Sequence, residues 1–463
     1  MEKILVIDSG TTNTKVFIYD RKLSLKEEAS TPTEISFPQA GFVEQNAENW
    51  FGAVVKGVRK LKNKKGIEAI SGSFQGATFV LLDKNLSPLR PAITWLDNRG
   101  EEFVPGFERR FGIHYFYKKT GHRILGWAPV VILKWIKKYQ PEIWKKTARI
   151  SFVSDYINFK LTGNFFLDPT SASMTTLFNI KKMEWDDELI EIAGIKKNML
   201  PDVIKSYECG GKLKRDTADL LSLQSGIPVL AGGHDQYCAS LGSGAFEKGK
   251  VLVSTGTAWA FLLKTDRIYY PDFSLSPGPH LYPGTYGLMG AISNGGIIYS
   301  WFMENFGTEK INLEKRPSEI IVIPHFSEKK GGFFNLSLST KPSEILLATI
   351  EVVGFQLREI FEKAEKVIEK NRIKKIILIG GGAKNKITPQ IVSDITKIMV
   401  EVPEIKEAAG RGAAILTLTE KDKKPSLSPL KGEIFRPDRK ISLLYNEKYR
   451  KYLSLKNRIL SHS

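Results

Sequence analysis

The sequence predicts an α/β protein built from two similar domains. Residues 4–19 and 251–263 share one plan, in which an apolar run, a polar Gly-Thr turn and a second apolar run follow each other. Their turn glycines, Gly10 and Gly256, lie 246 positions apart in a chain of 463 residues. β-Branched runs around a Gly/Thr turn are typical of hairpins, and a repeat at about half the chain length indicates a duplicated domain. Strand and helix patterns that alternate elsewhere favour the α/β class.

The other elements are predicted from the spacing of apolar residues. Residues 150–153 and 228–231 predict short buried strands, and residues 375–379 predict a strand that runs into three glycines. Residues 344–370 and the tail from Tyr449 to Leu460 have apolar side chains at helical spacing. The prolines and lysines of residues 421–435 predict a loop before the tail helix.

The domain boundary is expected in the glycine-rich segment 240–250. This places one domain at 1–244 and the other at 245–463, the second ending in the basic tail helix. A low-complexity linker is absent from the sequence, so we expect the two domains to pack around a central cleft.

Composition excludes several classes of protein. Hydrophobic residues make up 42% and charged residues 25%, as in ordinary globular chains. No stretch approaches the roughly 18 apolar residues of a membrane span. The first apolar strand starts after three residues, which leaves no room for a secretory signal. Two cysteines, Cys209 and Cys238, cannot form a disulfide framework. We therefore expect a cytoplasmic protein without a membrane partner.

The net charge of +18 is the unusual feature of the composition. Residues 421–463 contain 12 basic and 4 acidic residues, so much of the surplus lies in a tail that holds none of the motifs below. The other lysines come in short, scattered pairs. We expect a solvated lysine-rich surface and no nucleic-acid partner. The alternative, a basic nucleic-acid-binding protein, predicts binding with a steep salt dependence.

The first hairpin turn has the residues of a phosphate site. Gly10 permits a tight turn with backbone N–H groups that point the same way. Asp8, at the end of the preceding strand, could hold Mg²⁺ through its waters. Further donors for phosphate oxygens are Thr11, Thr12 and Lys15. A Walker A loop is absent, and an ordinary polar turn is the alternative. The second turn, with Gly256 and Thr257, favours the phosphate interpretation.

A second candidate site follows the strand at 228–231. Asp235 stands at the end of a glycine-rich strand and could accept a hydroxyl proton as a general base. Gln236 beside it could hydrogen-bond a sugar hydroxyl. The alternative for Asp235 is a turn or helix-cap aspartate. We expect His234 to be structural.

A third candidate site follows the strand at 375–379. Gly381 and Gly382 would let the backbone approach a flat ring or a phosphate. The segment is not a Gly-x-Gly-x-x-Gly fingerprint in an N-terminal βαβ unit, so a dinucleotide site is not indicated.

Taken together, these segments resemble the FGGY family of carbohydrate kinases, within the actin/hexokinase/chaperone ATPase superfamily, over nearly the whole chain. The matching segments, in family order, are Asp8 to Lys15, Gly41 to Gln45 with Trp50, Trp95 to Arg99, Asp155-Tyr156 with Leu161 to Gly163 and Asp168 to Ser173, Gly233 to Gln236, Ser254 to Thr257, and Gly381 to Ala383. The resemblance implies two actin/hexokinase-like (ribonuclease-H-like) domains that bind ATP and Mg²⁺.

The resemblance also implies a role for each motif residue. Asp235 would be the general base and Asp8 would organise Mg²⁺. The residues at the phosphates and the nucleotide would be Thr11, Thr12, Lys15, Gly256, Thr257, Gly296, Ser300, Gly381, Gly382 and Asn385. Gln75 and Gln236 would touch the sugar, and Asp97 would support that site. A non-kinase ATPase switch of the same superfamily is the alternative function.

The acceptor sugar is less well indicated, because two segments depart from the family pattern. Gly76 and Ala77 stand where xylulose-kinase relatives tend to carry Met-His and glycerol kinases Arg-Glu. Ile132 stands at the family's lysine position in the segment from Pro129 to Trp135. The small residues predict a roomier sugar pocket. A pentulose such as xylulose is the default expectation, with a hexulose, a deoxy sugar or a sugar acid as alternatives. A homodimer is possible, because dimers and tetramers are common in the family.

Overall fold

The computed structural model describes residues 2–256, 258–307, 316–326, 330–368, 373–420 and 422–461. The chain divides into two compact units that interleave in sequence. Unit 1 comprises Met1–Gly242, Asp266–Leu288 and Glu407–Ser428, and unit 2 comprises Ser243–Thr265, Met289–Lys406 and Pro429–Ser463. Each unit contains one of the predicted hairpins.

A mixed sheet forms the centre of unit 1. Its strand order is β13-β14-β5-β1-β2-β3, and β15 also pairs with β5. The bounds are β1 Lys3–Ser9, β2 Asn13–Asp20, β3 Leu25–Pro32, β5 Ile67–Phe74, β13 Cys209–Lys212, β14 Pro228–Leu230 and β15 Gly233–His234. β1 and β2 are the predicted hairpin, and β1 lies parallel to β5. The ends of β1 and β15 therefore meet near the same edge of the sheet.

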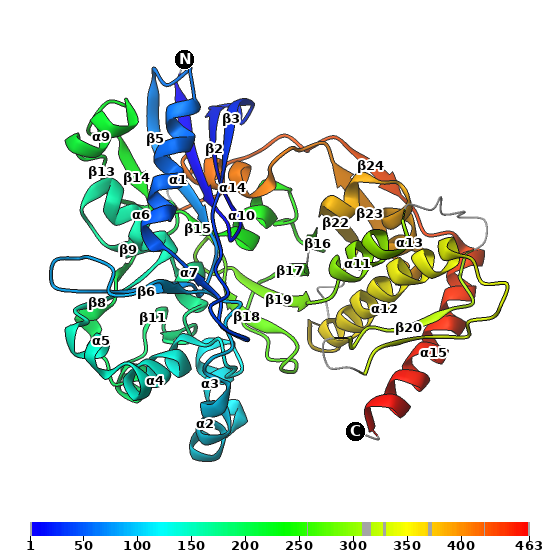
Figure 1. Ribbon diagram of the computed structural model, residues 1–463. Helices are drawn as coiled ribbons and strands as arrows, with labels where there is room; N and C mark the ends of the chain where they lie inside the picture. Colours follow the sequence, from blue (N-terminus) through cyan, green and yellow to red (C-terminus); the bar gives the residue numbers. More distant parts are fainter. Residues whose placement is uncertain are drawn as a thin grey trace. The chain divides into compact units, whose positions relative to one another are not determined.

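Helices cover both faces of this sheet (Figure 1). On one face, α1 (Ala47–Lys60) and α6 (Val153–Thr162) enclose a core that includes Leu5, Val16, Trp50 and Tyr156, all buried. On the other face lie α10 (Asp235–Gly242) and α14 (Ala408–Leu416), which pack closely against each other. β-Branched and aromatic residues on both sides of the strands explain why the sheet is buried in this way.

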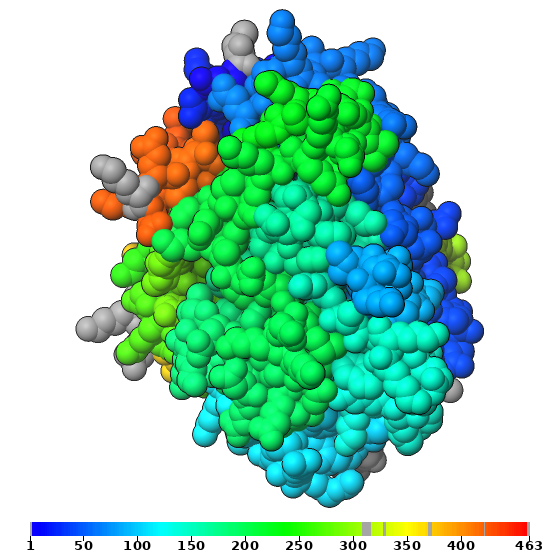
Figure 2. All heavy atoms as spheres, turned by 90° about the vertical axis from the view of Figure 1, so that its left-hand side faces the viewer, coloured from blue at the N-terminus to red at the C-terminus, as the bar shows by residue number. Residues whose placement is uncertain are grey.

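Unit 1 has a second hydrophobic core, which includes Phe79, Phe107, Ile132 and Trp185. The remaining helices of unit 1 are α2 Val104–Phe111, α3 Ile113–Thr120, α4 Pro129–Tyr139, α5 Pro141–Lys146, α7 Pro169–Ser173, α8 Asp187–Ala193 and α9 Arg215–Leu221, with 3₁₀ turns at Glu101–Phe103 and Lys197–Met199. Its remaining strands are β4 Glu44–Gln45, β6 Phe79–Leu82, β7 Ala92–Ile93, β8 Arg149–Phe152, β9 Phe166–Leu167, β10 Phe178–Asn179, β11 Glu184–Trp185, β12 Asp202–Val203 and β18 Ser276–Pro279. The cyan and green segments of this part cover most of the face in Figure 2.

Unit 2 repeats the hairpin plan around its own sheet. The strand order is β19-β17-β16-β22-β23-β24, with β16 antiparallel to β17 and parallel to β22. The strand bounds are β16 Lys250–Thr255, β17 Trp259–Thr265, β19 Tyr286–Ile292, β20 Ile321–Ile323, β21 Gly332–Phe334, β22 Lys375–Gly380, β23 Met399–Pro403 and β24 Gly432–Phe435. The helices are α11 Ile297–Phe306, α12 Pro342–Ile368, α13 Ile387–Thr396 and α15 Arg439–Ser461, with a 3₁₀ turn at Gly381–Lys384.

One predicted segment has a different structure. Residues 421–435 were expected to form a loop, but Gly432–Phe435 form β24, which pairs antiparallel with β23. The reason is long-range, because β23 would otherwise present an unpaired edge. A strand of four residues among prolines and lysines has too weak a local pattern to be recognised.

The basic tail helix α15 is attached to α12 by buried charges. Glu351 on α12 is fully buried and accepts hydrogen bonds from the Ser318 N–H at 3.0 Å and the Tyr445 hydroxyl at 2.8 Å. Lys448 on α15, also buried, forms an ion pair with it. Because an unpaired buried charge is costly, these contacts specify how α15 packs. None of the helices among the described residues is long and apolar enough to cross a membrane.

Asp155, at the start of α6, is expected to contribute more to the stability of unit 1 at acidic pH than above neutral pH. It is fully buried, and its carboxylate accepts from the Ser151 hydroxyl at 2.5 Å and the Phe152 N–H at 2.6 Å. Burial raises the pKa of Asp155 to about 7, and these hydrogen bonds offset only part of that rise. A carboxyl whose pKa is higher in the folded state favours folding fully below its unfolded pKa, about 4. This contribution is lost as the pH rises through about 7.

We therefore expect Asp155→Asn to raise the free energy of unfolding at pH 8 by about 1–3 kcal/mol, after allowance for its weaker hydrogen bonds. The gain should disappear near pH 3, where the Asp155 carboxyl of wild type is protonated in both the folded and the unfolded state. Urea unfolding at the two pH values measures the difference, with the exposed Asp202→Asn as a matched control. An equal change for Asp155→Asn at both pH values would contradict the assignment.

Candidate functional site

The first hairpin turn presents its polar residues at the end of β1. The Gly10 N–H donates to the Asn13 carbonyl at 3.0 Å and closes the turn. Asp8 and Lys15 are directly opposite each other on β1 and β2, so their side chains lie on the same face of the sheet. Thr11 is partly exposed and Thr12 is exposed at the tip. The turn therefore presents hydroxyls, backbone N–H groups and one ammonium group close to a carboxylate.

Asp8 belongs to a group of acidic side chains. The pKa of Asp8 is raised to about 7, chiefly by burial and to a smaller extent by the Asp235 and Glu407 carboxylates, while the hydrogen bond with Ser73 and the charge of Lys15 act in the opposite direction. Lys15 forms an ion pair with Glu407, with Nζ and Oε1 2.8 Å apart. The three carboxylates thus share one environment with Lys15. Such an environment favours an additional cation.

Asp235 is the first residue of α10, directly after β15. β15 reaches this position because Gly232 has φ 77° and a side chain there would meet the backbone of Gly72, with Cβ 2.3 Å from its carbonyl oxygen. The His234 N–H donates to Thr170 Oγ1 at 2.9 Å, and that hydroxyl donates to the buried Asp168 at 2.6 Å. The segment that presents Asp235 is therefore held by the close approach of Gly232 to the backbone of β5 and by a buried chain of hydrogen bonds.

His234 and Gln236 flank this carboxylate in different ways. His234 is buried, and its Nδ1 accepts from the Gln236 N–H at 3.3 Å and lies 3.3 Å from Asp235 Oδ1. Gln236 Oε1 is buried without a hydrogen-bond partner. A buried acceptor left unpaired in this way is available to a ligand hydroxyl.

The polar atoms of Gln75 are all bonded to protein groups. Its Oε1 accepts from Thr11 Oγ1 at 3.1 Å and from Thr78 Oγ1 at 3.2 Å. Its Nε2 donates to Gln45 Oε1 at 3.1 Å and lies 3.4 Å from the Gly10 carbonyl. Trp95 Nε1 donates to the same Thr11 hydroxyl at 3.0 Å. In the structure, Gln75 orders the first hairpin turn, and a sugar would have to displace one of these bonds to reach it.

The carboxylate oxygens of Asp97 are also fully occupied by hydrogen bonds from protein groups. It is fully buried and accepts from the Val43 N–H at 2.6 Å and from the Arg99 guanidinium at 2.8 and 2.9 Å. Arg99 in turn donates to Glu44 at 2.7 Å. Asp97 therefore supports the loop that carries Trp95, which is 41% exposed. Its contribution to the site is through that loop.

The space beside Gly76 is filled. A Cβ at this position would lie 2.7 Å from His234 Cδ2 and 2.9 Å from Met174 Cγ. The small residue thus admits the imidazole of His234, and the roomier pocket expected from Gly76 is not found at this point. The small size of Gly76 could not indicate that the space is filled, because the His234 ring that fills it comes from a segment far along the chain.

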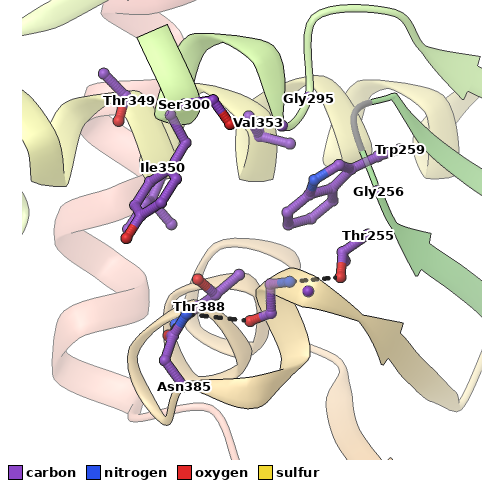
Figure 3. Close-up of a pocket in the computed structure, with 14 residues that line it drawn as sticks. Thr255, Gly256, Trp259, Gly295, Ser300, Thr349, Ile350, Val353, Asn385 and Thr388 are labelled. Atoms are coloured by element: carbon purple, nitrogen blue, oxygen red, sulfur yellow. Dashed lines mark hydrogen bonds between the residues drawn. The ribbon is translucent and has the colours of Figure 1, made fainter. Parts of the chain in front are cut away.

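Unit 2 contains a cavity of about 400 Å³. Figure 3 shows Trp259 facing it on one side and Ile350 on another, with Thr255, Asn385 and Thr388 along the lower edge. The lining residues are Thr255, Gly256, Trp259, Gly295, Gly296, Tyr299, Ser300, Thr349, Ile350, Val353, Gly381, Gly382, Asn385 and Thr388. The sequence predicted Gly256, Gly296, Ser300, Gly381, Gly382 and Asn385 for the nucleotide, and the structure brings these six together. Thr257 lies outside the described residues.

Two hydrogen bonds shape the glycine-rich edge of this cavity. Thr255 Oγ1 donates to the Ile379 carbonyl at 2.6 Å and accepts from the Gly382 N–H at 2.9 Å. Gly380 has φ 93°, and a Cβ there would lie 2.6 Å from the Thr255 carbonyl oxygen. The end of β22 therefore lies against the end of β16, and the glycine backbone forms the cavity wall.

Sequence reasoning assigned no role to four residues that this site uses. Trp95, Gln45 and Thr78 hold the first hairpin turn through Thr11 and Gln75, and Glu407 forms an ion pair with Lys15. Trp95 and Gln45 lie inside segments that carried the family resemblance. The resemblance marked these segments but implied no function for the two residues. Glu407 comes 392 positions after Lys15, and the signal was only an acid before a glycine-rich helix. No group of three or more His, Cys, Asp or Glu side chains suited to a metal ion was found among the residues with a described position.

Comparison with known proteins identifies the family to which the chain is similar. The model of the FGGY family of carbohydrate kinases, N-terminal domain, matches residues 3–242, and the C-terminal domain of the same family matches residues 326–420. The chain is 27% identical to a xylulose kinase of Staphylococcus xylosus over 441 residues, covering 90% of each chain. It is 27% identical to a gluconokinase of Bacillus subtilis over 446 residues (90% and 87% covered) and 29% identical to a glycerol kinase of Thermococcus kodakarensis over 446 residues (90% and 88% covered).

The fold also has close counterparts among solved structures. A xylulose kinase from Rhodospirillum rubrum superimposes with a TM-score of 0.90 at 22% identity, covering 100% of this chain and 99% of the other. This likeness confirms the predicted α/β class with two actin/hexokinase-like domains. With both family models matched, the chain belongs to the FGGY family of carbohydrate kinases.

Proposed function

We propose that this carbohydrate kinase transfers the γ-phosphate of ATP to a primary hydroxyl of a ketose or polyol, with a pentulose such as xylulose as the first acceptor to test. The observation that supports this most is the position of Asp235. It stands at the start of α10, in one electrostatic environment with Asp8 and the phosphate turn. A general base has to lie close to both the acceptor hydroxyl and the phosphate that the hydroxyl attacks.

The proposed chemistry is a single displacement. The acceptor hydroxyl gives its proton to Asp235, its oxygen forms a bond to the γ-phosphorus, and the bond to the β-phosphate oxygen breaks to release ADP. Gln236 Oε1, buried and unpaired, is suited to accept a hydrogen bond from a second acceptor hydroxyl. Thr11, Thr12 and Lys15 would donate to phosphate oxygens, and the cavity of unit 2 would hold the adenosine.

Mg²⁺ fits the residues of this site. Asp235 and Glu407 are close enough to Asp8 for their negative charges to raise its pKa, and Lys15 is already paired with Glu407. Asp8 would hold the ion, largely through water, since magnesium keeps several of its waters. When bound, the ion supplies positive charge for the phosphate oxygens. The residues of this chain supply the base, the turn and the cavity.

The nature of the acceptor is tested by a screen for ADP release. Purified protein with ATP and Mg²⁺ is offered pentuloses, hexuloses, deoxy sugars, polyols and aldonic acids, including xylulose and gluconate. We expect at least one primary-alcohol acceptor to raise ADP release by roughly tenfold or more above the background hydrolysis of ATP. A constant rate of ATP hydrolysis with every acceptor would favour the alternative, a non-kinase ATPase switch.

The cavity of unit 2 provides a direct test of nucleotide binding. Trp259 lines the cavity from β17. Because an indole that exchanges water for a bound nucleotide changes its environment, we expect ADP to alter the tryptophan emission of the protein. Trp259→Phe should remove most of that change, whereas Trp144→Phe, on α5 of unit 1, should retain it. An ADP response that survives Trp259→Phe would place the nucleotide elsewhere.

A further inference from the structure

Glu407 is the least explained charged residue near the phosphate turn. It is the N-cap of α14, and its carboxylate forms an ion pair with Lys15 at 2.8 Å. The side chains of Lys15 and Glu407 are 37% and 23% exposed. An ion pair of this kind on an ordinary surface contributes little to stability. Stability alone therefore gives a weak reason for its presence beside Asp8 and Asp235.

The fold positions Glu407 rigidly. Lys15, Phe17 and Tyr19 alternate along β2 and share one face of the strand. α14 lies against that face, because a Cβ at Gly410 would lie 2.7 Å from Phe17 Cε2. The Tyr19 hydroxyl lies 3.5 Å from the Glu407 carbonyl. Glu407 therefore reaches Lys15 from a helix terminus whose backbone is packed against the strand that carries Lys15.

α14 is itself locked to the helix that begins with Asp235. A Cβ at Gly412 would lie 1.9 Å from the Cys238 carbonyl oxygen, and a Cβ at Gly242 would lie 1.9 Å from the Ala408 carbonyl oxygen. Backbone thus meets backbone between α10 and α14. Groups held on rigid elements in this way keep their geometry better than groups on loops.

A rigidly held Glu407 would restrain the flexible side chain of Lys15. A lysine has three ammonium donors on a flexible four-carbon stem, so it binds phosphate as a mobile point charge unless another group restrains it. The bond to Glu407 uses one donor and leaves two. It also holds the ammonium group on the face of the sheet that carries Asp8.

We propose that Glu407 is the positioning residue for Lys15, which it holds ready to bind the β- and γ-phosphates of the nucleotide. This inference rests on the proposed function, in which Lys15 contacts those phosphates. Glu407 itself touches neither nucleotide nor acceptor in this scheme. It acts through Lys15, and its effect should exist only when Lys15 is present.

A double-mutant cycle tests this dependence. The affinity for the ATP analogue AMP-PNP with Mg²⁺ is measured by calorimetry for wild type, Glu407→Gln, Lys15→Met and the double variant. We expect Lys15→Met to weaken binding roughly tenfold and Glu407→Gln roughly threefold to tenfold. In the Lys15→Met background, Glu407→Gln should not weaken binding further, because the residue that it positions is absent.

Three controls separate positioning from a structural role. Adenosine lacks phosphates, so its affinity should be the same in all four proteins. Glu407→Asp, which keeps the charge, should restore part of the lost AMP-PNP affinity. Asp422→Asn removes an exposed ion pair of unit 1 with Lys205 and should leave AMP-PNP affinity unchanged. Thermal midpoints should differ little between wild type and Glu407→Gln.

The outcomes are distinct. Equal weakening by Glu407→Gln with and without Lys15 would overturn the inference, and so would unchanged or tighter binding in the single variant. In both cases the proposed function would stand, because wild type still binds the nucleotide. Failure of wild type to bind AMP-PNP would reject the proposed function and this inference with it.

Discussion

Replacement of Asp235 by asparagine is expected to slow phosphoryl transfer by roughly 10²–10⁴-fold or more, the range for the loss of a general base. Asparagine has nearly the same shape, so α10 should still start at this position and His234 should keep its place beside it. The amide cannot take the proton of the acceptor hydroxyl. The loss should therefore appear in kcat, while the affinity for ADP changes little.

The measurement is ADP release with the best acceptor from the screen, together with ADP binding by calorimetry. Asp219→Asn, at an exposed position of α9 in the same unit, is the matched control and should keep full activity. An Asp235→Asn protein with wild-type kcat would remove Asp235 from the role of base. Equal loss of ADP affinity and activity would instead indicate that Asp235 acts in nucleotide binding.

The sequence was sufficient for the repeated hairpins because each is local. An apolar run, a glycine turn and a second apolar run are visible within about 16 residues, and both pair as predicted, with Asp8 opposite Lys15 in the first. The family confirmed by comparison follows from several such local motifs in order. Local patterns of this kind survive without knowledge of the tertiary contacts.

The hydrogen bonding of the site could not be predicted in this way. Gln75 is saturated by Thr11, Thr78 and Gln45, which come from three separate segments. A glutamine on a glycine-rich strand end has the same sequence pattern whether its amide faces a sugar or the protein. The same holds for Gly76, where the sequence shows a missing side chain but not the His234 ring that fills the space.

The ion pair of Glu407 with Lys15 shows most clearly that contacts between distant segments could not be predicted from the sequence. Its partner Lys15 is 392 positions away, and the contact depends on α14 returning to unit 1 after the chain has built most of unit 2. A division of the chain at one point near residue 244 would assign Glu407 to the other half. The interleaving of the units arises from tertiary packing, for which the chain has no local signal.

The packing of α14 against α10 leads to the second large expected effect. Gly412→Ala should lower the free energy of unfolding by roughly 3 kcal/mol, at the upper end for overpacking. The added Cβ would lie 1.9 Å from the carbonyl oxygen and 2.6 Å from the carbonyl carbon of Cys238. These atoms belong to the backbone of α10, so no side-chain rotation can make room. The helix propensity of alanine returns only about 1 kcal/mol.

The same substitution should also lower activity in the protein that remains folded, because any movement of α10 displaces Asp235 at its first position. Urea unfolding and kcat are measured side by side, with Gly52→Ala as the matched control. Gly52 lies inside α1 with nothing within 4 Å of a Cβ, so alanine there should stabilise the protein by about 0.5–1 kcal/mol and leave kcat unchanged. A Gly412→Ala protein as stable and active as wild type would show that α10 and α14 can separate freely, and the rigid placement of Glu407 beside Lys15 would then lose its structural basis.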